Sequence, residues 1–159
     1  MANQGPDSGG GFEKIVVRLG NRVIKGFLEN RSEDTLDLLL RDAAADPPAL
    51  LRIRPIGEDT IQEIPTHSTK AVFFVKDFDG IPEHKNLQFY RGAPIAHGVW
   101  IRVEFTDGEI MEGLVHNTVR FLVDPGFFMR PTDPYSNNRL VYVVKSWLKE
   151  CRILGLRNI

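Results

Sequence analysis

The sequence has a single cysteine, Cys151, which excludes an intrachain disulfide and a zinc site built from several cysteines. No apolar run approaches the roughly 20 residues that a membrane-spanning helix needs. The segment at residues 1–11 is polar and glycine-rich with no apolar core, so it does not resemble a signal peptide. These absences favour a soluble protein of the reducing cytoplasm, in which Cys151 is expected to be a small buried residue.

The chain also lacks an excess of charge of either sign, since its formal net charge is −1. Residues 12–79 carry 10 basic and 12 acidic side chains, residues 98–159 carry 8 and 7, and lysines and arginines form no run. A protein that binds nucleic acid through nonspecific phosphate contacts normally has a basic face. The composition therefore does not favour such binding, although folding can still build a local basic patch.

Catalytic and metal-binding motifs are missing too. The sequence has no Gly-x-Ser-x-Gly motif of a serine nucleophile and no glycine-rich phosphate loop followed by a helix. Its four histidines, His67, His84, His97 and His116, show none of the close spacings that are typical of metal ligands. We therefore expect no enzyme activity, no cofactor and no metal, with a triad assembled from distant residues left as the open alternative.

The clearest feature that is present is an internal repeat. Residues 15–30 and 101–117 both alternate apolar and polar side chains, pass through a turn and continue as a second apolar stretch. The turns hold a Gly-Asn pair in the first copy and an Asp-Gly pair in the second, and both pairs tolerate positive φ in hairpins. Each second strand contains a glycine, Gly26 or Gly113, which indicates a bulge or bend that lets one strand serve both sides of a small barrel.

A second match follows each hairpin, and it keeps one constant offset along its whole length. The segment 64–75 aligns with the segment 143–154, so that Lys70 falls on Lys149. Both segments predict a strand, one short turn and a final strand. The remaining strands are expected at 36–40 and 127–129, as the third strand of each copy, and at 50–56 and 140–144, leading into the final pair.

Each copy therefore has about five short strands, and no long helical period is present in the chain. We expect an all-β fold of two small five-stranded barrels of the SH3 or Sm class, arranged in tandem and with little helix. In this interpretation residues 12–79 form the first barrel and residues 99–159 the second. Residues 1–11 would be a disordered tail and residues 80–98 a linker, in which a short helix over 82–90 is one alternative.

The second copy resembles a known family. Residues 105–115 resemble the first motif of bacterial Sm-like (Hfq-type) proteins, where a strand turns through Asn-Gly or Asp-Gly and continues to a bent glycine. Residues 140–148 resemble the second motif, where a strand turns tightly into the last one. The resemblance covers roughly residues 99–154 and, more faintly, residues 14–75. It implies the Sm-like fold and leaves function open, because one fold serves many functions.

The Sm-like resemblance also implies a place where RNA would bind. In that family the second motif carries a Lys-His pair that lines an RNA-binding pore. Here Lys145 is followed by Ser146, and the matching residues of the first copy are Thr66 and His67, so neither copy has the complete pair.

The stretch at 130–139 is the most unusual one in the chain, with two prolines, two asparagines, a serine and an aspartate. As a structural turn, it would use Asp133 and Ser136 to bond nearby backbone N–H groups. As a recognition loop, it would offer arginines to a phosphate or carboxylate and an aromatic face for stacking. Its candidate partner-binding residues are Arg130, Asp133, Tyr135, Asn137, Asn138 and Arg139.

A second candidate set would serve nucleic-acid binding. Arg52 and Arg54 lie two apart and share one face of a strand, which together with Arg41 makes the most basic patch of the sequence. A solvated surface face is the alternative interpretation. With the motif residues above, the set is Arg41, Arg52, Arg54, His67 and Lys145.

These observations favour a non-catalytic interaction or adaptor module that binds a protein partner, or a second copy, through barrel edges and the loop at 130–139. The stretches 70–79 and 126–139 also resemble an uncharacterised bacterial family similar to domains found beside PilZ-type and type IV pilus or secretion regulators, which implies a regulatory role. An Sm-like RNA-binding protein is the first alternative. A sensor of an anionic small ligand, such as a nucleotide, is the second.

Overall fold

The computed structural model describes four stretches of the chain: 13–29, 50–79, 98–133 and 135–157. The predicted tail, the predicted third strand at 36–40 and all of the predicted linker except Gly98 lie outside them. Within the four stretches lie ten strands, one helix and two 3-10 turns: β1 (Lys14–Leu19), β2 (Val23–Leu28), β3 (Leu50–Pro55), β4 (Gln62–Pro65), η2 (Thr66–Ser68), β5 (Thr69–Val75), β6 (Gly98–Phe105), β7 (Ile110–Val115), α2 (Val119–Val123), β8 (Gly126–Pro131), β9 (Asn138–Val144), η3 (Lys145–Trp147) and β10 (Leu148–Arg157). The prediction of an all-β chain with little helix is confirmed. No helix of the described stretches has the length and apolar character needed to cross a membrane.

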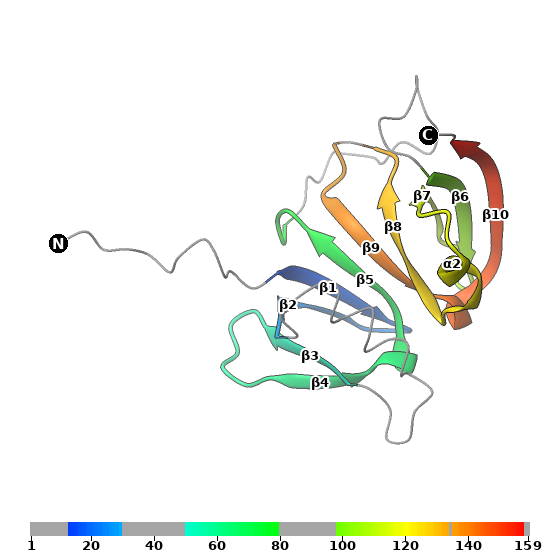
Figure 1. Ribbon diagram of the computed structural model, residues 1–159. Helices are drawn as coiled ribbons and strands as arrows, with labels where there is room; N and C mark the ends of the chain where they lie inside the picture. Colours follow the sequence, from blue (N-terminus) through cyan, green and yellow to red (C-terminus); the bar gives the residue numbers. More distant parts are fainter. Residues whose placement is uncertain (1–12, 30–49, 80–97, 134, 158–159) are drawn as a thin grey trace.

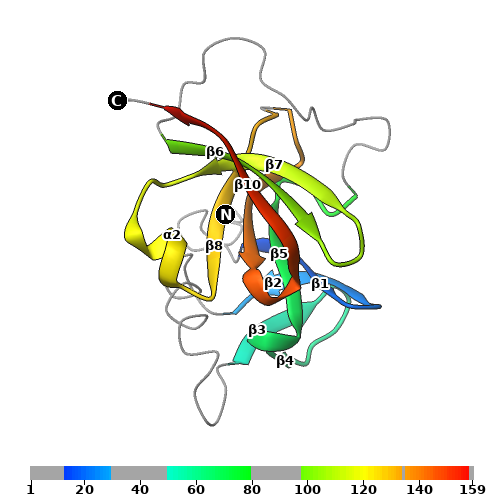
Figure 2. The same cartoon turned by 90° about the vertical axis from the view of Figure 1, so that its right-hand side faces the viewer.

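The ten strands form one open antiparallel sheet in the order β10-β6-β7-β8-β9-β5-β1-β2-β3-β4 (Figure 1). The order is the same in both halves of the chain: the last strand lies beside the first, and the second, third and fourth follow. The halves join where β5 pairs with β9, so the two predicted units share a continuous sheet. Strands β4 and β10 are its two outermost strands, and Figure 2 shows β10 running along the near side of the molecule.

The strand register also repeats between the halves. Gly26 of β2 lies opposite Pro55 of β3, and Gly113 of β7 lies opposite Pro131 of β8. A Cβ atom on Gly26 would come within 2.2 Å of the Arg54 carbonyl oxygen. The predicted glycines therefore occupy equivalent places, where a neighbouring strand approaches too closely for any side chain.

The predicted sequence of strand, short turn and strand is confirmed at the end of each half. β4 ends at Pro65 and β9 at Val144, the turns η2 and η3 follow, and β5 and β10 begin at Thr69 and Leu148. Each final strand also has a register shift against the first strand of its half, next to Lys70 in β5 and next to Lys149 in β10. The constant offset seen in the sequence therefore relates equivalent backbone positions.

The strand predicted at 50–56 is present as β3, but its predicted equivalence to residues 140–144 is wrong. The sequence predicts that residues 50–56 lead into the final pair, as residues 140–144 do in the second half. The structure places β3 third, between β2 and β4, so that it corresponds to β8. The fourth strand is β4, whose four residues include Gln62 and Glu63 and are too few to show an alternating pattern.

Two hydrophobic cores pack against the sheet, and β5 contributes to both. Val72 and Phe74 pack into the core of the first half, while Ala71, Phe73 and Val75 pack into the core of the second. All seven residues of β5 are buried. Because successive residues of a strand face opposite sides, the two halves pack against opposite faces of this shared strand.

Candidate functional site

Among the described elements, the edge strand β10 and the helix α2 both carry exposed apolar side chains, and β10 is the one that also lies at the edge of the sheet. It pairs with β6 along one side, and its side chains include Ile153 and Leu156, which are 57% and 67% exposed. Natural edge strands are usually short, charged or covered, because an uncovered edge invites another strand to pair with it. The expectation that Cys151 is buried is wrong, since it lies exposed on this edge.

The other free edge, β4, is short and mixed in character. Its Glu63 carboxylate lies 3.6 Å from the Arg52 guanidinium of β3, and Ile64 is buried in the first core. Just before the strand, Ile61 is 36% exposed. This edge therefore offers a short row of backbone groups flanked by one exposed apolar side chain.

A charged cluster fastens the two halves together at the junction. Lys70 of β5, which is 3% exposed, donates hydrogen bonds to Asp107 over 2.7 Å and to Glu109. Arg18 of β1 donates to both oxygens of Glu109, over 2.7 and 2.9 Å. The hydrogen bond from Lys70 holds the pKa of Asp107 below its ordinary value. Two cations facing two carboxylates make a neutral clamp that holds the β6–β7 turn on β1 and β5.

Sequence reasoning missed this cluster. Lys70 lies in an apolar strand, and its carboxylate partners are 37 and 39 residues further along the chain. The repeat alignment held one usable signal, since Lys70 matches Lys149 and both adjoin the register shifts of β5 and β10. A charged residue inside a buried strand needs an oppositely charged partner, so an ion pair for Lys70 is predictable, but the partner residues are not.

A cleft of about 530 Å³, lined by polar and apolar side chains alike, opens at the clamp. Its walls come from both halves, and its rim carries the exposed Arg22 and Lys25. Lys25 donates to the Phe78 carbonyl oxygen over 3.1 Å. The cleft is thus an open surface between the β1–β2 turn and the junction.

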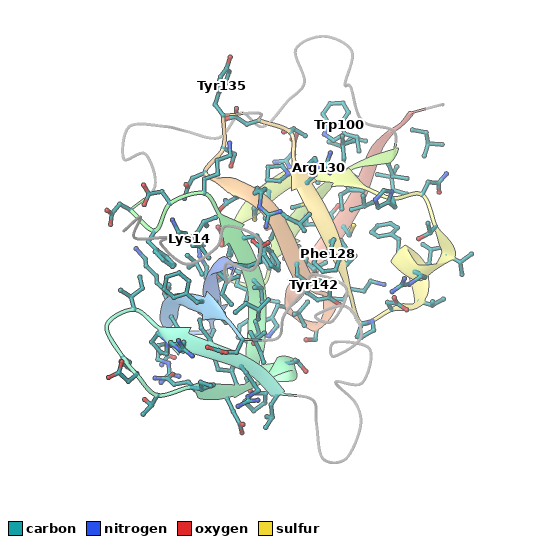
Figure 3. The ribbon with its side chains drawn as sticks, turned by 60° about the vertical axis from the view of Figure 1, so that its left-hand side comes forward. Lys14, Trp100, Phe128, Arg130, Tyr135 and Tyr142 are labelled. Atoms are coloured by element: carbon teal, nitrogen blue, oxygen red, sulfur yellow. The ribbon has the colours of Figure 1, made fainter. Side chains whose placement is uncertain are left out.

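The loop before β9 is held by its own side chains. The Asp133 carboxylate accepts a hydrogen bond from the Tyr135 backbone N–H over 2.9 Å, and Ser136 Oγ accepts one from the Asn138 backbone N–H over 3.1 Å. Asp133 and Ser136 are buried. This is the bonding expected of a structural turn. Tyr135 is 73% exposed, and Figure 3 shows it pointing away from the strands.

The remaining candidate residues of this loop are spread over different contacts. Asn137 exchanges two hydrogen bonds with the backbone of Asp77 after β5, over 2.8 and 3.1 Å. Arg139 forms an ion pair with Glu13 over 2.5 Å. Arg130 is exposed at the end of β8. The structure therefore gives Asp133, Asn137 and Asn138 positions that shape the loop, and their role in binding stays a prediction.

The nucleic-acid set is placed in scattered positions. Arg54 forms an ion pair with Glu29 over 2.7 Å, as Arg52 does with Glu63. Lys145 is half-buried in η3, and burial lowers its pKa below the ordinary value. The backbone of His67 belongs to η2, whereas its side chain and all of Arg41 lie outside the described residues. Arg52 and Arg54 thus face carboxylates, which weakens the basic patch that the sequence predicts.

Comparison with known proteins adds a family. A family model described as a family of unknown function, DUF6982, matches residues 11–155. The chain belongs to this family. No curated protein and no solved structure matches the chain.

The charged and metal-ligating side chains of this DUF6982 chain are arranged as follows where the structure describes them. Among its described residues, no group of three or more histidine, cysteine, aspartate or glutamate side chains is placed to hold a metal ion. The buried ammonium of Lys70 is engaged by two carboxylates. Surfaces open to another molecule in the described stretches include the two outer strand edges, the apolar residues of α2, the exposed loop and the cleft.

Proposed function

We propose that this DUF6982 chain is a non-catalytic interaction module of two Sm-like units, which binds another polypeptide by strand addition at its sheet edges. A regulatory or adaptor role would follow from such binding. The identical strand order of the two halves and the motif resemblance support the Sm-like interpretation. The observation that carries the proposal is the ten-residue outer strand β10, whose exposed side chains include Ile153, Leu154 and Leu156.

Strand addition suits this edge energetically. An edge strand carries unpaired backbone N–H and C=O groups, and an incoming strand bonds them while its side chains meet those of the edge. Covering an apolar side chain such as Ile153 or Leu156 contributes about 1–2 kcal/mol, because each is already partly buried. The near-neutral charge of the chain suits a protein partner better than a polyanion.

The test compares three forms of the full chain as bait in affinity purification from an extract of the native cells. Ile153→Lys places a charge where a new strand would bury it, while Leu122→Lys is a matched change on the exposed face of α2. We expect a bound protein that wild type and Leu122→Lys retain and Ile153→Lys loses. The same bound set for all three forms would contradict the proposal.

The RNA alternative is tested with the same proteins. We expect only weak binding of short single-stranded RNA, with no difference between wild type and Ile153→Lys. Tight binding that falls steeply as salt increases would favour the Sm-like RNA-binding alternative instead. Binding of a nucleotide that Arg139→Ala abolishes would favour the anion sensor.

A further inference from the structure

The joint between the two halves is itself a pairing of two strand edges. β5, the last strand of the first half, pairs with β9, the fourth strand of the second half, with Phe74 opposite Leu140. The ion pairs of Arg18 and Lys70 with Glu109 connect the same two halves beside this joint. The chain thus contains one complete example of how a last strand and a fourth strand associate.

The two free edges are the same two kinds of strand. β4 is the fourth strand of the first half, and β10 is the last strand of the second. We propose that β10 of one copy of this chain pairs with β4 of a second copy, in the register by which β5 pairs with β9. This proposal rests on the proposed function, because it names the protein that binds the edge.

The shared register brings two exposed apolar side chains together. At the constant offset that relates the two halves, Phe74 corresponds to Ile153 and Leu140 corresponds to Ile61. Phe74 is fully buried opposite Leu140 at the internal joint. Ile153 and Ile61 are among the exposed large hydrophobic residues of the chain, and pairing between copies places them opposite each other. The association would bury both.

The positions equivalent to Arg18 and Glu109 also carry opposite charges near the free edges, but with acidic and basic residues exchanged. The turn hydrogen bonds from Leu19 N to Arg22 O and from Phe105 N to Glu109 O, both 2.8 Å, show that Arg22 corresponds to Glu109. In the register of the first strands, Arg18 corresponds to Glu104, because Leu19 and Phe105 are the equivalent last residues. The internal pair of Arg18 with Glu109 thus becomes Glu104 with Arg22 of the next copy.

Because both charges are exchanged, the proposed contact of Glu104 with Arg22 of the next copy stays attractive. Arg22 is exposed on the rim of the cleft, and Glu104 lies 3.6 Å from Lys149, the counterpart of Lys70. A second copy would therefore add Arg22 to an acidic and basic pair that already stands at the β10 edge.

The proposed contact joins unlike surfaces, so copies associate head to tail. Such contacts generate a closed ring or an open filament, according to the rotation between successive copies. A symmetric pairing of β10 with β10 would use neither Ile61 nor Arg22. The two arrangements therefore predict different responses to substitutions at β4.

The experiment measures the mass of the full chain in solution by size exclusion with light scattering. Wild type and the control Leu122→Lys are expected to form oligomers of the 18.0 kDa chain. Ile153→Lys and Ile61→Lys should each be monomers. An equal mixture of these two variants should give dimers and nothing larger, because each supplies the edge that the other lacks.

Both changes are made at exposed side chains, and circular dichroism with thermal unfolding verifies that each variant is folded. A monomeric wild type at its highest soluble concentration would overturn the proposal. Oligomers that persist in Ile61→Lys, or a mixture that stays monomeric, would overturn it as well. If wild type is monomeric while Ile153→Lys still loses a different captured protein, the proposed function stands and this inference alone fails.

Discussion

At the scale of single residues, Lys70 shows how a buried charge is kept in a strand. It lies among apolar neighbours and is held by Asp107 and Glu109, with Phe105 presenting its ring 4.4 Å from the ammonium. Removing one partner of such a cluster costs more than the cluster adds, because the others lose their compensation. The clamp therefore fixes the halves relative to each other more than it raises stability.

The clamp makes the folding stability depend on pH in the acid range, through Asp107. The pKa of Asp107 lies below its ordinary value of 3.8 because Lys70 donates to it. A lowered folded pKa gives stability that is present above the ordinary pKa and is lost as pH falls through the lowered one. In Lys70→Met we expect the Asp107 pKa to rise towards its ordinary value and this acid-side loss of stability to shrink, while the Glu109 backbone N–H still donates to Asp107. Carboxyl NMR titration measures both proteins.

Glu112 serves as the internal control in that titration. Burial is the main cause that raises its pKa, and Lys70 is not among the causes. Its titration should be the same in Lys70→Met and in wild type. If the Asp107 pKa did not move, the hydrogen bond from Lys70 would not be its cause.

At the scale of elements, the sequence predicts most individual strands and turns but does not predict which strands pair between the two halves. Alternation and turn pairs predict both hairpins, and the constant offset between the halves predicts the last two strands of each. β5 is buried on both faces, and the apolar run of such a strand does not reveal which strand pairs with its edge. Residues distant in sequence form both the pairing of β5 with β9 and the clamp at Lys70. No local sequence pattern therefore predicts either of them.

The bend of β2 depends on a glycine that both halves share. A Cβ on Gly26 would lie 2.2 Å from the Arg54 carbonyl oxygen and 2.9 Å from Pro55 Cα, and these backbone atoms cannot rotate away. We expect Gly26→Ala to lower the free energy of unfolding by about 2–3 kcal/mol, in line with overpacking. Urea denaturation at one fixed protein concentration measures the loss.

Gly155→Ala is the matched control for this change. A Cβ there would meet Trp100 at 3.6 Å, an ordinary contact, in a strand with one free side. Its free energy of unfolding should change by less than about 0.5 kcal/mol, as is usual for surface changes. Equal effects of the two substitutions would show that β2 and β3 do not approach each other so closely.

At the scale of the whole molecule, the two outer strands β10 and β4 are equivalent to β5 and β9, the two strands that pair where the halves join. Arg22 and Glu104 stand on different halves, at the positions that Glu109 and Arg18 occupy at the joint. Within one copy they serve no common contact. Under the proposed pairing, their opposite charges would attract each other where two copies meet.

Charge reversal separates this assembly from a general effect of net charge. Arg22→Glu and Glu104→Arg shift the net charge in opposite directions, yet each would place like charges together between copies. We expect each to raise the concentration at which half of the chains are assembled by about 2- to 5-fold, the size typical of exposed ion pairs. The double variant restores both the net charge and the attraction, so its midpoint should return towards that of wild type. Light scattering over a dilution series measures the four midpoints, and additive weakening in the double variant would contradict a direct contact between these two residues.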